Sequence, residues 1–329
     1  MATIIMIKYN PEMLIYISTF FISLIVTMLA TPLVLKLALT IGAVDNPDER
    51  KIHKQAIPRL GGLAIYAGFV LAMLSAILLA RIMGRGLEVL HLLGILTGGT
   101  LILILGIIDD FRGLKPLPKF IWQILTSAVI IYFGVSIGFV SNPLNGLFAI
   151  GWLGVPLTML WLVGMTNAIN LIDGLDGLAA GVTAISAGTL FFVALRTHQI
   201  SSAIIMLALC GSALGFLRYN FFPAKIFLGD SGSYFLGLML AAASIIGVFK
   251  TTLVVALLIP IMILGVPIFD TMFAIGRRFK EGRSLFSADN KHIHHMLLRA
   301  GFTQREAVLA IYVACFLLSI GALLMALQR

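Results

Sequence analysis

Four stretches of this sequence set carboxylates, amides or histidines beside glycines and basic residues, where such groups could bind phosphate and a divalent cation. In the first, GIIDDFRGLKP, Asp109 and Asp110 are adjacent and Lys119 follows. Because neighbouring carboxylates repel each other, the pair needs a cation nearby. A lone DD pair at a helix end is usually just solvated, so this motif by itself only weakly indicates a magnesium and phosphate site.

The second stretch, NAINLIDGLDG, carries Asn167, Asn170, Asp173 and Asp176 at three-residue intervals. Side chains spaced in this way lie on one face of a helix. A helix that only packs against its neighbours has little use for four polar side chains in a row, whereas a nucleotide or metal site does. We therefore predict that this motif is functional.

The third stretch, FLGDSG, places Asp230 between Gly229 and Ser231. Glycines allow backbone N–H groups to approach an oxyanion, and one carboxylate can hold a hard cation. In isolation the same letters describe an ordinary turn. Whether the segment is a binding site or a simple turn therefore depends on whether Asp230 lies on the same side of the membrane as the other aspartates.

The fourth stretch ends in HIHH, which contains His292, His294 and His295 behind a basic cluster that includes Arg283. Three histidines this close could bind zinc. Their spacing and the absence of a nearby cysteine match structural zinc sites poorly, however. Contact of the imidazoles with phosphate or sugar suits the basic surroundings better.

The elements that position these groups are membrane helices. The chain is 60% hydrophobic and 11% charged, against about 45–50% and about 25% in ordinary globular domains. Its apolar runs predict an all-α, polytopic integral membrane protein, a single transmembrane domain over residues 1–329 with about ten helices. The predicted spans are residues 13–35, 61–80, 90–108, 119–138, 152–171, 178–195, 200–217, 233–249, 251–275 and 306–326. Pro260 and Pro267 should kink the ninth span.

Charge predicts the orientation of these spans. The loops after the odd-numbered spans hold most of the 23 lysines and arginines, and the opposite side keeps only Lys8, Arg81, Arg85, Arg196, Lys250 and Arg329. The positive-inside rule makes those five loops cytoplasmic and both termini extracytoplasmic, in the cell membrane. Every aspartate also lies on or near the cytoplasmic side. The net charge of +9 therefore marks membrane topology rather than nucleic-acid binding, and the aspartates predict a shared polar site.

With these motifs in order, the chain resembles the polyprenyl-phosphate N-acetylhexosamine-1-phosphate transferases of the WecA/TagO type, which are related to the MraY enzymes. The matching segments are DNPDERKIHKQAIPRLGG, DDFRGLKP, NAINLIDGLDGLAAG, NFFPAKIFLGDSGS and HIHH, spread over nearly the whole length. PRLGG and HIHH resemble the hexosamine branch more than the MraY branch. The resemblance therefore favours UDP-GlcNAc as the donor.

The resemblance implies a role for each matching acidic residue. Asp109 and Asp110 would lie near the lipid phosphate. Asp230 would bind Mg²⁺, for which Mn²⁺ is a plausible substitute. Asn170 and Asp173 would support the diphosphate and the metal.

The resemblance also implies contacts with the rest of the donor. Asp176, Asn220 and Phe227 match positions at the uracil end. Lys51 and Lys119 match basic residues that face phosphates, and the three histidines match a loop that contacts diphosphate or sugar. Asn167 and Arg283 complete the substrate-binding set that we predict from the motifs.

The implied reaction joins a UDP-N-acetylhexosamine to a polyprenyl phosphate in the membrane, and the resemblance also suggests a homodimer. Direct attack by the lipid phosphate and a covalent aspartyl-phosphate route both stay open. Two other functions are considered: an MraY-like phospho-MurNAc-pentapeptide transferase and, more remotely, a secondary transporter. Transporters keep their ionisable residues near the midplane and show internal repeats, and this sequence shows neither.

Overall fold

The computed structural model describes residues 11–45, 56–142, 146–149, 151–248, 259–282 and 292–327. The helices are α2 (Pro11–Thr40), α3 (Gly61–Ile82), α4 (Val89–Arg112), α5 (Pro116–Tyr132), α6 (Gly154–Ile172), α7 (Leu178–Arg196), α8 (Ile200–Asn220), α9 (Gly229–Val248), α11 (Gly265–Lys280), α12 (Ile293–Arg299) and α13 (Gln304–Leu327). Two antiparallel pairs of strands join β1 (Val44–Asp45) to β2 (Ile57–Pro58) and β3 (Phe139–Asn142) to β4 (Gly146–Ala149).

The predicted all-α, multi-pass architecture is confirmed. Within the described ranges, eight helices are long and apolar enough to cross a membrane: α2, α3, α4, α6, α7, α8, α9 and α13. The predicted fourth span, 119–138, is wrong in extent, because α5 has 17 residues and ends at Tyr132, two residues before Gly134 with its positive φ of 90°. The ninth span is described only from residue 259, so the total of ten stays a prediction.

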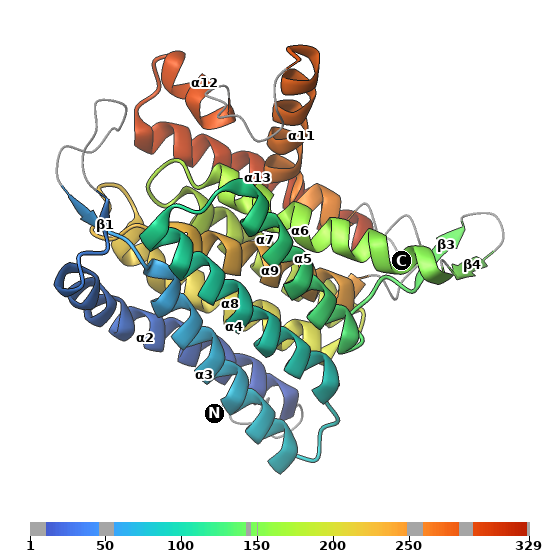
Figure 1. Cartoon of the computed structure of the whole chain (residues 1–329). Helices are drawn as coiled ribbons and strands as arrows, with labels where there is room; N and C mark the ends of the chain where they lie inside the picture. The colour runs from blue at the N-terminus through green and yellow to red at the C-terminus, as the bar shows by residue number, and fades with distance from the viewer. Residues whose placement is uncertain are drawn as a thin grey trace.

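The predicted break in the ninth span is confirmed. Residues 259–263 are helical, the chain turns at Leu264, and α11 begins at Gly265. The break lies between Pro260 and Pro267, whose missing N–H groups cannot continue the helical hydrogen bonds. Beyond it, α11 stands away from the bundle, as Figure 1 shows, and contacts α6 and α13.

The centre of the bundle is α9. It packs against α3, α4, α6, α7 and α8, and every residue from Ser231 to Gly247 is buried. Because a helix enclosed on all sides cannot shift without moving its neighbours, α9 gives the residues at its first turn a rigid support.

The outer helix α2 has its polarity reversed relative to a helix of a soluble protein. Its buried face carries Thr19, Ser23, Thr27 and Thr31, while leucines such as Leu33, which is 67% exposed, point outward. Small residues allow close contact with α3 and α8, and the exposed leucines suit lipid. This reversal identifies α2 as a lipid-facing membrane helix.

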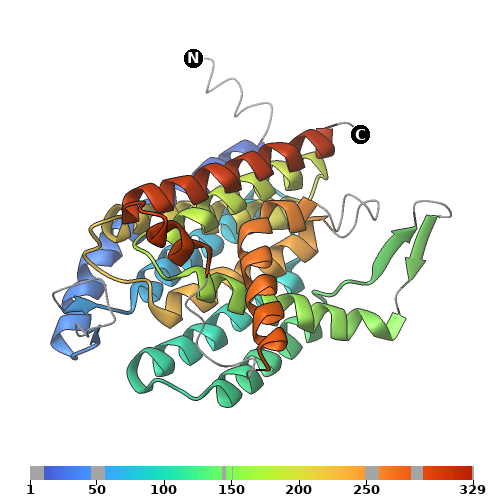
Figure 2. The same ribbon diagram turned by 90° about the horizontal axis from the view of Figure 1, so that it is seen from above.

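The helix ends that carry the polar motifs lie at one end of the bundle. Figure 1 shows β1 at this end and the β3–β4 hairpin at the opposite end, and Figure 2 shows the same separation from above. The ends of α4, α6 and α8 and the beginning of α9 meet there around one pocket. Segments that are distant in sequence are thus brought together by the alternation of the helices.

Glycines allow α4 to lie directly against the first turn of α9. A Cβ atom on Gly106 would lie 2.5 Å from the backbone nitrogen of Ser231 and 2.7 Å from the carbonyl oxygen of Asp230. No Cβ atom tolerates such a contact, and the atoms it would meet are backbone atoms. Gly106 therefore sets the distance between α4 and the start of α9.

We expect the Gly106→Ala variant to be destabilised by about 1–3 kcal/mol, because the added methyl must displace α9. Its thermal unfolding temperature in detergent should fall. The matched control is Gly164→Ala in α6, where an added Cβ meets no atom within 4 Å. That variant should unfold at the wild-type temperature or slightly above it, since alanine favours a helix over glycine. Equal behaviour of the two variants would contradict the close contact.

Candidate active site

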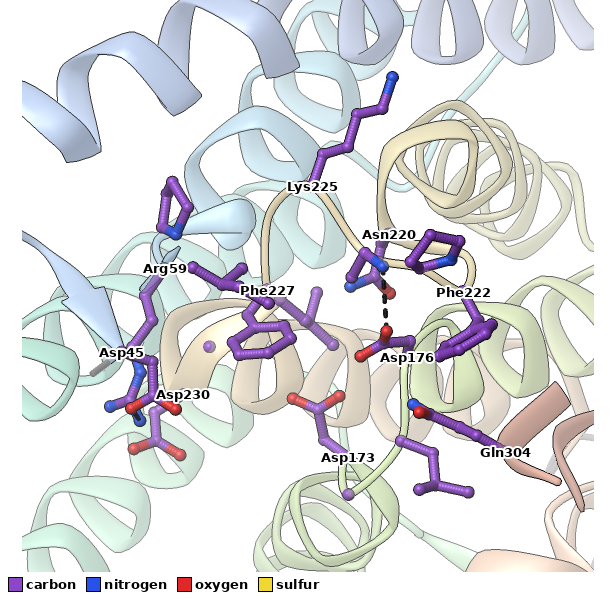
Figure 3. Close-up of a pocket in the computed structure, with 18 of the residues that line it drawn as sticks. Asp45, Arg59, Asp173, Asp176, Asn220, Phe222, Lys225, Phe227, Asp230 and Gln304 are labelled. Carbon is purple, nitrogen blue, oxygen red and sulfur yellow. Dashed lines mark hydrogen bonds and ion pairs between the residues drawn. The ribbon is translucent and has the colours of Figure 1, made fainter. Parts of the chain in front are cut away.

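A pocket of about 1200 Å³ lies where α6 and α8 end and α9 begins. Its lining comes from five parts of the chain, represented by Arg59, Asp110, Asp173, Asp230 and His295. Figure 3 shows the carboxylates of Asp173, Asp176 and Asp230 around the ring of Phe227. The pocket therefore combines several carboxylates with an aromatic surface.

Asp173 and Asp176 lie in the turn between α6 and α7. The prediction that they share a helical face with the preceding asparagines is wrong, because α6 ends at Ile172 and the turn passes through Gly177, whose φ is 78°. Both carboxylates nevertheless line the pocket, and so does Asn170 near the end of α6. The turn, and not a helical face, therefore brings Asp173 and Asp176 to the same pocket as Asn170.

Asn167 does not line the pocket. Its Nδ2 donates to Oε1 of Gln123 in α5 at 2.6 Å and to the carbonyl oxygen of Val163 at 2.8 Å. One helical turn separates Asn167 from the pocket-lining Asn170, so the first links α6 to α5 while the second reaches the pocket. The structure therefore places Asn167 beside the pocket and not in its lining, although the motif predicted that it binds substrate.

Asp230 lies in the first turn of α9 and is held by α6. Nδ2 of Asn170 donates to Oδ1 of Asp230 at 2.7 Å and to Oγ of Ser233 at 2.9 Å. Since both acceptors lie in the first turn of α9, Asn170 fixes the orientation of that turn. The Asp230 carboxylate is thus presented to the pocket by two helices.

Asp110 caps α9 from a different helix. Its Oδ1 accepts the N–H of Asp230 at 2.7 Å and its Oδ2 accepts the N–H of Ser231 at 3.1 Å. Those N–H groups have no partner within α9, and a carboxylate at this position also suits the helix dipole. Asp110 therefore both lines the pocket and holds the helix that carries Asp230.

Asp109 is not among the residues that line the pocket, although it is adjacent to Asp110. It is 2% exposed and forms an ion pair with Lys119 at 2.5 Å. It also accepts hydrogen bonds from the Tyr234 hydroxyl at 2.9 Å and from the Leu114 N–H at 2.8 Å. Asp109 and Lys119 thus join α4 to α5 and α9 beside the site rather than within its lining.

The loop after α8 is closed by two of the predicted substrate-binding residues. Asn220 is buried, accepts the N–H of Gly177 at 3.1 Å and donates to the carbonyl oxygen of Ile226 at 3.0 Å. Asp176 accepts the N–H of Ala224 at 2.9 Å, drawn as the dashed line in Figure 3. These bonds hold the loop so that Phe227 faces the pocket.

The electrostatics of the pocket favour a bound cation. Burial raises the pKa of Asp173 well above its usual range, and the carboxylates of Asp230, Asp110 and Asp176 raise it further, while Arg59 lowers it. A cation placed among these groups would relieve that repulsion. No three His, Cys, Asp or Glu side chains of the described segments form a ready-made metal site. Mg²⁺ usually takes one or two carboxylates and completes its shell with substrate phosphates and water, so Asp173 and Asp230 are the side chains that could hold it here.

Comparison with known proteins identifies the family. The model of glycosyl transferase family 4 matches residues 92–248. A probable undecaprenyl-phosphate N-acetylglucosaminyl 1-phosphate transferase of Bacillus subtilis is 42% identical over 317 residues, which are 96% of this chain and 86% of that protein. The chain belongs to this family of sugar-1-phosphate transferases.

Two further relatives carry similar names. A decaprenyl-phosphate N-acetylglucosaminephosphotransferase of Mycobacterium leprae is 40% identical over 91% of this chain and 80% of its own length. The undecaprenyl-phosphate alpha-N-acetylglucosaminyl 1-phosphate transferase of Escherichia coli K12 is 29% identical over 88% of this chain and 78% of its own. These names agree with the hexosamine branch and do not favour the MraY-like alternative.

The transferase brings most of the predicted site residues together. The pocket lining includes the following members of the predicted set: Asp110, Asn170, Asp173, Asp176, Asn220, Phe227, Asp230 and His295. Asp109, Lys119, Asn167, His292 and His294 lie outside the lining. Lys51 and Arg283 fall outside the described residues.

Several lining residues of the transferase were not predicted as site residues. Arg59 and Asp45 form an ion pair across β1 and β2, and Phe222, Lys225 and Gln304 contribute further walls. Arg59 lies within the PRLGG segment, one of the motifs recognised in the sequence. The motif did not reveal that the Arg59 guanidinium acts on the Asp173 carboxylate. Gln304 begins α13 and carries no motif that could have revealed it.

The three predicted histidines of the transferase have different surroundings. His295 lines the pocket, whereas His292 and His294 are only 5% and 2% exposed. Burial and the neighbouring His295 and His292 lower the pKa of His294 to about 4. At neutral pH the ring of His294 is therefore uncharged and packs against the rings of His292 and His295.

Proposed function

We propose that this chain transfers GlcNAc-1-phosphate from UDP-GlcNAc to a polyprenyl phosphate and releases UMP. An oxygen of the lipid phosphate forms a bond to the phosphorus attached to the sugar, and the bond from that phosphorus to the UMP oxygen breaks. The observation that carries the proposal is a pocket lined by Asp110, Asp173, Asp176 and Asp230 at the ends of membrane helices. The names of the relatives support the same substrates.

Magnesium is part of this proposal, with Mn²⁺ as a substitute. Asp230 and Asp173 would hold the ion, which would offset the negative charge that develops on the departing UMP. Asn170 keeps Asp230 oriented through its 2.7 Å hydrogen bond. Asp110 keeps the first turn of α9 in place, so its contribution to the reaction is to position Asp230.

The acceptor needs little activation from the protein. By analogy with phosphorylated side chains, whose second pKa is about 6, a lipid phosphate is mostly dianionic at neutral pH. Its oxygen can therefore attack without a strong base, which favours direct transfer. Asp109, already bound to Lys119 and Tyr234, suits a role in the framework of the site better than a role as a nucleophile.

The donor would lie along the α8–α9 loop. The ring of Phe227 offers a flat surface against which a uracil base can stack, and Asn220 and Asp176 hold the loop that presents it. We place this site on the cytoplasmic side of the membrane, with both termini on the other side, because most basic residues belong to these loops. The homodimer stays a prediction.

The decisive measurement is UMP release by the purified protein. We expect release from UDP-GlcNAc to depend on both added polyprenyl phosphate and Mg²⁺, and to stop when EDTA is added. UDP-GalNAc and UDP-MurNAc-pentapeptide serve as competing donors in the same assay. Hydrolysis without the lipid acceptor, or a preference for the pentapeptide donor, would refute the proposed function.

A further inference from the structure

A buried carboxylate of α11 lies outside the pocket and outside the proposed mechanism. Asp270 is 2% exposed, and a buried charge is costly unless it has close partners. Its Oδ2 accepts a hydrogen bond from Nδ1 of His292 at 2.8 Å, and its Oδ1 accepts one from the backbone N–H of Ile293 at 2.9 Å. Both carboxylate oxygens of Asp270 therefore accept hydrogen bonds from the beginning of α12.

From this point a row of three imidazoles leads to the pocket. The rings of His292 and His294 are parallel, with an interplanar angle of 2° and centroids 5.9 Å apart. The rings of His294 and His295 follow at 4.2 Å, and His295 lines the pocket. The row therefore runs from Asp270 to the pocket, with each ring next to the following one.

The middle imidazole also supports the turn that carries Asp173. A Cβ atom on Gly174 would lie 2.7 Å from Cε1 of His294, so only a glycine allows the ring to lie this close to the turn. The position of α12 consequently affects two parts of the pocket at once. One is the His295 side chain and the other is the turn that follows α6.

We infer that Asp270 is a positioning residue for the transfer reaction: it anchors the start of α12 so that His295 reaches the pocket and His294 braces the turn at Gly174. Asp270 does not touch the pocket itself. Its negative charge also selects the His292 tautomer that donates from Nδ1. The inference rests on the proposed function, since it assigns Asp270 a part in that reaction.

The first test is the Asp270→Asn variant of the full-length protein. The amide keeps the size of the side chain and one acceptor for Ile293, but it presents an N–H group where His292 now donates. We expect kcat for UMP release to fall about 100-fold, as for small misplacements of catalytic groups. The KM for UDP-GlcNAc should change much less than kcat, because Phe227, which would stack against the uracil, belongs to the loop after α8 and not to α12.

The matched control is Glu306→Gln in α13. Glu306 also caps the start of a helix, through the N–H and hydroxyl of Thr303 at 2.8 Å each, and it is hydrogen-bonded to no histidine of the described residues. This variant should keep wild-type kcat. An equal loss in both variants, or no loss in Asp270→Asn, would overturn the inference.

A double-mutant cycle separates positioning from general stability. If Asp270 acts through the histidines, Asp270→Asn should reduce kcat much less in a His295→Ala background than in the wild type. A residue that merely stabilises the fold would reduce kcat by the same factor in both backgrounds. Equal factors would therefore overturn the inference.

A readout without turnover tests the anchor directly. Met296 in α12 is 48% exposed, and both native cysteines are buried, so Met296→Cys provides a single site for a spin label. The label should become more mobile when Asp270→Asn is added and stay unchanged with Glu306→Gln. Unchanged mobility with Asp270→Asn would overturn the inference, whereas an inactive wild type with a mobile label in that variant would refute only the proposed function.

Discussion

The Asp230→Asn variant is expected to lose transfer activity by about 10³-fold while remaining folded and inserted. Asparagine has the shape of aspartate, and its side-chain oxygen can still accept the 2.7 Å hydrogen bond from Asn170. Asp110 caps the backbone of this turn, so α9 should begin as in the wild type. The substitution therefore removes one negative charge from the pocket and little else.

The measurement is the rate of UMP release over a range of Mg²⁺ concentrations. If Asp230 binds the ion, very high Mg²⁺ should recover part of the activity. The matched control is Glu12→Gln, which removes a carboxylate paired with Arg85 at 3.5 Å, at the end of the bundle away from the pocket. It should leave the rate unchanged. Wild-type turnover by Asp230→Asn at ordinary Mg²⁺ would exclude Asp230 from the metal role.

The Lys119→Met variant should be destabilised by about 3–5 kcal/mol. Asp109 has no exposed side-chain surface, so removing its cation leaves a buried charge without its ion-pair partner. The hydrogen bonds from Tyr234 and Leu114 remain but do not neutralise that charge. Thermal unfolding in detergent, with α4 and α5 reported by protease protection, measures the effect.

The double variant Asp109→Asn, Lys119→Met distinguishes a structural pair from a simple loss of packing. Because it removes both charges, it should regain much of the stability that Lys119→Met loses. Lys115→Met, an exposed change four residues earlier in the same segment, is the control and should change stability by less than about 0.5 kcal/mol. A double variant as unstable as Lys119→Met would contradict the paired role.

The sequence alone was sufficient to predict an all-α protein with several membrane spans. In lipid, backbone groups must be satisfied within a helix, so each long apolar run predicts a span. Charged groups avoid the bilayer core, so Asp110, Asp173 and Asp230 lie at helix ends or in turns. The buried Asp270, by contrast, lies inside α11 and has close partners. The segments NAINLIDGLDG, FLGDSG and HIHH were also selected from the sequence alone, and each of them contributes a residue to the pocket.

Only the tertiary structure decided which member of each motif faces the pocket. Successive residues of a helix point about 100° apart, so Asp109 and Asp110 belong to different environments, one toward Lys119 and one toward α9. A three-residue interval does not keep Asn167 and Asp173 together, because α6 ends between them.

Local pattern also cannot reveal partners that are distant in the chain. The acceptor for His292 is Asp270 of α11, 22 residues away, and Gln304 reaches the pocket from a helix without any motif. Hydrophobic periodicity and charge indicate whether each face of a helix lies against lipid, water or protein, which is a local property of the sequence. Which polar groups meet one another depends on how the helices pack, and that is a property of the assembled bundle.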